Sequence, residues 1–125
     1  MFRLELMLLL TLALLGCREP VDLALPSTAE IEAHYLYKGP LGADVKGNVA
    51  VVTVGQSAQQ LRRGGKLWAK VGPYIFLFSE ETQQLMDNYP GLAAVRVITT
   101  VGESEVANVL LGRDALSDVQ WRRAL

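Results

Sequence analysis

The sequence predicts a single small domain of the α+β or α/β class, in which helices pack on a sheet of about four strands. Residues 48–54 and 92–101 are rich in β-branched apolar side chains and are typical of strands inside a sheet. Helix signals lie around and between them, which indicates a sheet with helices on at least one face. Residues 1–16 form a separate apolar segment, and the 109 residues that follow suit one domain, predicted over residues 27–125.

The first element of this domain, residues 27–38, fits two patterns. Ser27 and Glu30 have the spacing of a capping box, and Ile31 and Tyr35 lie one helical turn apart, which favours a helix. Apolar and polar residues also alternate over the same stretch, which favours a strand. We predict a helix, and the strand is the alternative.

Turns and a short helix surround the first predicted strand. Residues 39–42 and 44–47 are predicted to be turns because they contain glycine, proline and aspartate. After the strand, Ser57 has the position of an N-cap for a short helix over residues 58–63.

The middle of the chain predicts a hairpin followed by a helix. A Gly-Pro pair separates residues 66–71 from residues 74–78, so we expect two short strands joined by a turn. Ser79 then caps a helix that runs to about Asn88 and carries acidic residues in its first turn.

The last third predicts two helices after the second strong strand. Residues 103–111 have apolar side chains at helical spacing, and Ser117 opens a final helix with Trp121 on its core side. The sequence ends at Leu125, two turns into this helix. Two interpretations stay open: a short terminal helix that docks on the domain, or a chain truncated at its C-terminus.

The motif Leu14-Leu15-Gly16-Cys17 ends the N-terminal segment and contains the only cysteine. About ten apolar residues precede it, whereas a transmembrane helix needs about twenty. This arrangement resembles the lipobox of bacterial lipoprotein signal peptides. The resemblance implies a signal peptide over residues 1–16, cleavage between Gly16 and Cys17, and lipidation of the cysteine thiol.

The same resemblance implies where the protein works. Acyl chains on Cys17 would anchor it to a membrane of the cell envelope, and residues 17–26 would form a short tether. The domain would therefore stay close to that membrane. Arg18, where an aspartate would favour the inner membrane, resembles the pattern of outer-membrane lipoproteins that face the periplasm. The cell surface and the inner membrane are the alternatives.

Composition argues against several classes of protein. Without Arg3 and Glu5 of the leader, 11 basic residues face 12 acidic ones, whereas nucleic-acid binders are usually strongly basic. Lipidation of Cys17 would leave no cysteine for a disulfide or a zinc site. The single histidine, His34, has no further ligands at metal-binding spacing. We predict no metal and no cofactor.

Two residues, Ser57 and His34, are candidate catalytic groups. Gly55-Gln56-Ser57 resembles the beginning of the nucleophile elbow G-x-S-x-G, but Gln59 replaces the second glycine, and a helix cap explains Ser57. His34 would need a nucleophile and an orienting carboxylate, and a surface or partly buried histidine beside acidic residues is the favoured explanation. We predict no catalytic residue. A tethered hydrolase that uses Ser57 or His34 is an alternative function.

A cationic stretch is the candidate binding site. No acidic residue lies between Val45 and Ser79. The candidate patch consists of Arg62, Arg63, Lys66, Trp68 and Lys70. On a strand, the last three would share one face and could meet anionic lipid, an anionic glycan or an acidic partner. The alternative is a solvated face on which lysine stems cover the tryptophan.

The predicted function is therefore a non-enzymatic binding, accessory or scaffolding lipoprotein with an unidentified envelope protein as partner. A glycan- or lipid-binding domain is the second alternative.

Overall fold

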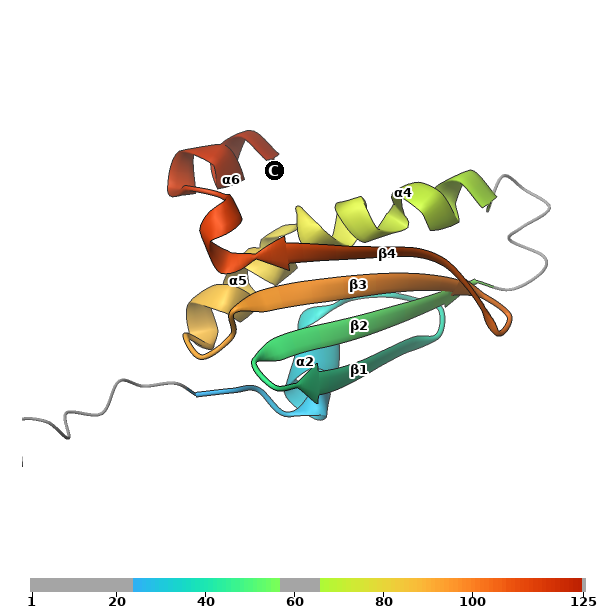
Figure 1. Cartoon of the computed structure of the whole chain (residues 1–125), viewed down its shortest axis with the longest axis horizontal. Coiled ribbons are helices and arrows are strands. Elements are labelled where there is room, and N and C mark those ends of the chain that lie inside the picture. Colours follow the sequence, from blue (N-terminus) through green and yellow to red (C-terminus); the bar gives the residue numbers. More distant parts are fainter. Residues whose placement is uncertain (1–23, 57–65, 125) are drawn as a thin grey trace, which may run out of the picture.

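The computed structural model describes residues 24–56 and 66–124 (Figure 1). Its elements in chain order are α2 (Thr28–His34), β1 (Leu41–Lys46), β2 (Val49–Gln56), α4 (Lys66–Leu77), α5 (Glu80–Asn88), β3 (Ala94–Val101), β4 (Ser104–Gly112), the 3-10 helix η2 (Arg113–Ala115) and α6 (Asp118–Ala124). The strands form one four-stranded sheet in the order β1-β2-β3-β4. The predicted class, a small sheet with helices packed on it, is confirmed.

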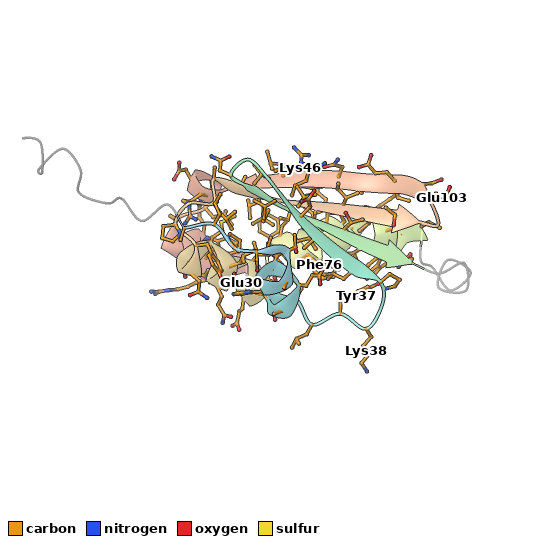
Figure 2. All side chains as sticks on the ribbon, turned by 90° about the horizontal axis from the view of Figure 1, so that it is seen from below. Glu30, Tyr37, Lys38, Lys46, Phe76 and Glu103 are labelled. Carbon is orange, nitrogen blue, oxygen red and sulfur yellow. The ribbon has the colours of Figure 1, made fainter. Side chains whose placement is uncertain are left out.

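The sheet consists of two hairpins joined by a parallel pair. β1 pairs with β2 and β3 with β4 in antiparallel fashion, while β2 and β3 are parallel. Each hairpin turn begins with a glycine at positive φ, Gly47 at 62° and Gly102 at 59°, a conformation that strains other residues. Helices α2, α4 and α5 cover one face of the sheet. The other face, which we call the open face, is the one from which the Lys46 side chain projects (Figure 2).

The core lies between the sheet and these helices. Alternate residues of β2 and β3 point into it, as the period of a strand requires. The large fully buried aliphatic side chains in the described ranges are Ile31, Val52, Val54, Leu77, Leu85, Leu92, Val95 and Val97. Trp121 of α6 is also buried in this core, as predicted from the sequence.

The helix predicted for the first element is confirmed over Thr28–His34. The Ser27 hydroxyl accepts from the Glu30 amide, and the Glu30 carboxylate accepts from the Ser27 amide, both at 3.2 Å. This reciprocal capping satisfies two amides that would otherwise lack partners at the helix start. Ile31 and Tyr35, one turn apart, are both buried. The chain becomes extended at Tyr35.

The hairpin predicted over residues 66–78 is wrong: α4 is one helix with Pro73 inside it. Proline has no amide hydrogen for the Ala69 carbonyl four residues earlier. The buried hydroxyl of Thr99 on β3 donates to that carbonyl instead. A Cβ on Gly72 would come within 3.2 Å of the Thr99 methyl carbon, so glycine allows α4 to lie close to the sheet. Gly72 and Pro73, which resemble a turn signal in the sequence, therefore lie inside a helix that packs closely on the sheet.

Two further elements differ from the sequence prediction. Asp44 lies in β1, and the turn predicted over residues 44–47 is confined to residues 47–48. Residues 103–111, predicted as a helix, form most of β4, where Leu111 is buried and Leu110 lies on the open face. Backbone pairing with β3 decides this strand, and local spacing does not reveal that pairing. The helix predicted over residues 58–63 lies outside the described residues.

Arg113, directly after β4, ties the end of α5 to the sheet. Its guanidinium donates to the carbonyls of Met86, Tyr89 and Leu92 at distances of 2.7 to 2.9 Å. The last carbonyls of a helix lack partners within the helix and carry its negative dipole end, so a cation is favourable there. In the described part of the chain, no helix is long and apolar enough to cross a membrane.

Candidate functional site

Several residues singled out in the sequence lie outside the described residues. They are Gly16, Cys17, Ser57, Arg62 and Arg63, together with the predicted signal peptide over residues 1–16 and the first residues of the predicted tether. Lipidation at Cys17 and the helix cap at Ser57 therefore stay predictions.

Trp68 and Lys70 of the candidate patch do not share a face, and the side chain of Lys66 lies outside the described ones. On a helix, residues two apart point in directions about 200° different, so Trp68 lies across α4 from Lys70. Lys70 is exposed, while Trp68 is half-buried and stacks on Tyr37 with ring centroids 5.9 Å apart. The strand predicted for this segment is wrong, because the segment has the period of a helix. Binding by the candidate patch stays a prediction.

His34, the catalytic alternative, has both ring nitrogens engaged. Its Nδ1 lies 2.8 Å from the Glu30 carbonyl oxygen, which can only accept, so Nδ1 carries the hydrogen. Its Nε2 lies 3.4 Å from the Asn88 side-chain nitrogen. The ring also meets the edge of Tyr89, with centroids 6.1 Å apart. The histidine therefore joins α2 to the end of α5.

The carboxylate and hydroxyl next to His34 bind each other. The Tyr89 hydroxyl donates to Glu30 Oε2, while Oε1 of the same carboxylate accepts from the Ser27 amide. The hydrogen bond from Tyr89 holds the pKa of Glu30 below its ordinary value and raises the pKa of Tyr89. These contacts cap α2 and do not form a nucleophile activated by a base.

The outer side of α4 carries large exposed apolar side chains. Leu67, Val71, Tyr74 and Ile75 are 69%, 41%, 50% and 59% exposed, and we call them the α4 apolar face. Their spacing of four, three and one residues places them along one side of the helix. The inner side is apolar too, since Ala69 and Leu77 are buried in the core. Apart from the exposed Lys70, the described side chains on both sides of α4 are apolar, and a helix of this kind is normally covered on both sides.

A hollow of about 290 Å³ opens beside this face, between α4 and the segment that follows α2. We call it the aromatic hollow. It is lined by Tyr35, Leu36, Tyr37, Trp68, Ile75, Phe76, Ser79 and Glu81. Tyr37 and Phe76 lie side by side in Figure 2, with centroids 5.6 Å apart and rings at 75°. Aromatic walls of this kind suit an apolar ligand group.

Polar contacts fix these walls in place. The Tyr35 hydroxyl donates to Thr82 Oγ1 at 2.7 Å, and that hydroxyl donates to the Phe76 carbonyl at 2.6 Å. Ser79 Oγ donates to the same carbonyl at 2.5 Å. Two hydroxyls at the start of α5 therefore hold the end of α4. Burial raises the pKa of Tyr35 to about 12. The Tyr37 hydroxyl donates to the Gly55 carbonyl at 3.1 Å.

A second hollow, of about 460 Å³, adjoins the first. We call it the acidic hollow. It is lined by Glu30, Ala33, His34, Leu36, Glu81, Gln84 and Tyr89. Leu36 and Glu81 line both hollows, which therefore form one groove with an aromatic end and an acidic end. Glu81 is half-buried, and its carboxylate makes no hydrogen bond or ion pair with any residue in the described ranges.

A third hollow lies on the open face of the sheet, around Val51, Arg96 and Leu110. Lys46 and Arg96 both line it, and Arg96 donates to the Asn108 side-chain oxygen at 2.5 Å. Among residues 24–56 and 66–124, no cluster of histidine, cysteine and acidic side chains could hold a metal ion.

No known protein family, curated protein or solved structure matches this chain. Function is therefore inferred from the chain's own residues. Leu36, Ile75 and Glu81 were not singled out in the sequence. The spacing of the α4 apolar face could have indicated Ile75 only if the Gly-Pro pair had been assigned to a helix, and no local pattern indicated Leu36 or Glu81.

Proposed function

We propose that the protein is a non-enzymatic binding lipoprotein of the bacterial cell envelope, held at a membrane by acyl chains on Cys17. In this proposal it binds a protein partner through the α4 apolar face. The resemblance of residues 14–17 to a lipobox supports the location. The observation that carries the binding function is a helix whose outer side exposes four large apolar side chains in a row.

Charge near this face favours a protein over a bilayer as the occupant. Glu80 and Glu81 begin α5, two residues after the end of α4, and Glu81 lines the same hollow as Ile75. Anionic lipid head groups would repel these two carboxylates, which outnumber the exposed Lys70 among the described side chains of α4. An apolar, aromatic centre with charges at its rim is the usual composition of a protein–protein interface.

The arrangement around His34 gives less support to the hydrolase alternative. A hydrolase needs a nucleophile that a base can deprotonate and a site where the reacting carbonyl would sit. Here the neighbouring hydroxyl, Tyr89, already donates to Glu30, and His34 Nδ1 donates to a backbone carbonyl. The groove offers apolar walls and a free carboxylate, which suit recognition.

The membrane anchor is tested by the intact mass of the protein extracted from membranes of a producing bacterium. We expect the mass of a chain that begins at Cys17 and carries acyl groups. A Cys17→Ala variant should lose both the acyl mass and the cleavage. An unmodified full-length mass in the soluble fraction would overturn the anchor.

The binding face is tested by a photo-crosslinking amino acid placed at Ile75 in living cells. Leu110, which is 48% exposed on the open face of the sheet, is the matched control position. We expect one discrete protein adduct from position 75 that a Leu67→Glu substitution abolishes, and none from position 110. Adducts with lipid alone, or equal adducts from both positions, would overturn the proposed face.

A further inference from the structure

The groove beside α4 combines two chemistries that the proposed protein-binding face does not explain. Its aromatic end has three rings, those of Tyr37, Trp68 and Phe76, with centroids between 5.6 and 6.5 Å apart. Its acidic end has the carboxylates of Glu30 and Glu81. Leu36 stands between the two ends and is 91% exposed. The exposed Leu36 side chain and the unpaired Glu81 carboxylate therefore both lie where the two hollows adjoin.

We propose that this groove binds a basic, apolar segment of the protein partner, with an apolar side chain in the aromatic hollow and a lysine or arginine beside Glu81. The inference rests on the proposed function, since it names the chemistry of the partner at the same surface. Ile75 belongs both to the α4 apolar face and to the aromatic hollow, so the groove continues that face.

The charge of the groove selects a cation. The oxygens of Glu30 are occupied by Ser27 and Tyr89, but the group keeps its negative charge. Glu81 has its carboxylate free of partners in the described part of the chain. The two carboxylates line one hollow, and the imidazole of His34 is held by Glu30 and Asn88. A cation from the partner would offset this negative charge, whereas a carboxylate would be repelled.

The shape of the groove suits the two parts of such a segment. The aromatic hollow, about 290 Å³, has room for one bulky side chain. The stem of a lysine or arginine can lie along Leu36 while its head reaches the half-buried Glu81. Buried aromatic anchors and charge pairs of this kind carry most of the energy in protein interfaces.

Three blocked peptides test the proposal on the protein as the producing bacterium makes it, extracted from its membranes in detergent. They are acetyl-Ser-Leu-Arg-Ser amide, the acidic acetyl-Ser-Leu-Glu-Ser amide and the polar acetyl-Ser-Ser-Arg-Ser amide. Binding is followed by the NMR shifts of the Leu36, Ile75 and Glu81 amides. We expect saturable shifts with the first peptide and at least about five-fold weaker binding of the other two.

Glu81→Gln should weaken the first peptide about five-fold and abolish its preference over the acidic one. Glu80→Gln is the matched control, because it removes a charge from the same helix turn without lining either hollow. Absence of shifts with all three peptides, equal binding of the basic and acidic peptides, or equal effects of the two substitutions would overturn the inference. A crosslinked partner at position 75 without peptide binding would overturn only this inference and leave the proposed function standing.

Discussion

Replacing Thr99 by valine removes one hydroxyl and keeps the shape of the side chain, and we expect this change to destabilise the domain. The hydroxyl donates to the Ala69 carbonyl, which Pro73 leaves without a donor inside α4. Thr99 and Ala69 are both completely buried, so water cannot replace the lost hydrogen bond. A buried carbonyl left without a donor costs about 1 to 3 kcal/mol of unfolding free energy.

A second substitution tests the cause of that loss. Alanine in place of Pro73 restores an amide hydrogen at the position that normally donates to the Ala69 carbonyl. Thr99→Val should then cost at least about 1 kcal/mol less in the Pro73→Ala background than in the native sequence. This difference is the coupling energy between the two positions.

The four proteins are compared by urea unfolding, followed by tryptophan fluorescence and by circular dichroism. Each kcal/mol also corresponds to about 4 to 8 °C in the midpoint of thermal unfolding for a domain of this size. Thr100→Val, a half-buried neighbour on the other face of β3, is the control and should change stability by less than about 0.5 kcal/mol. An equal cost of Thr99→Val in both backgrounds would refute the reasoning.

Three further outcomes follow from the described contacts. Arg113→Ala should lower the unfolding free energy by about 2 to 3 kcal/mol, measured by urea unfolding, because three carbonyls at the end of α5 lose a charged donor. Gly39→Ala should displace Tyr37, because the new Cβ would lie 2.6 Å from its ring, and NMR signals around the aromatic hollow should shift while the core signals stay. Stability should fall as the pH rises from about 10 toward 12, since burial raises the folded pKa of Tyr35 to about 12 and the unfolded value is near 10. This contribution is complete below pH 10, and a Tyr35→Phe protein that kept the same alkaline dependence would contradict the assignment.

Elements with local signals were predicted well. The capping box at Ser27 and the cap at Ser79 mark the starts of α2 and α5, since each consists of contacts within one helical turn. The β-branched runs of β2 and β3 likewise show their period over a few residues. The sequence also carries the lipobox-like motif at Cys17, which is read from the chain itself and needs no fold.

The groove was not predicted, because its residues come from distant parts of the chain. Leu36, in the segment after α2, and Glu81, in α5, line the same hollows because α2 packs beside α5. The sequence placed Trp68 beside lysines on a strand, whereas it stacks on Tyr37. A strand and a helix have different periods, so assigning the wrong one moves a side chain to another face.

The sequence by itself determined the class of the fold, the elements with caps or strong periodicity, and the motif that predicts a membrane anchor. Only the tertiary structure decided that α4 continues through Pro73 and that residues 104–112 form a strand. The physical reason is the same in both cases. A donor on β3 replaces the hydrogen bond that proline removes from α4, and the backbone of β3 supplies the partners of β4, so each element depends on groups that are distant in the sequence.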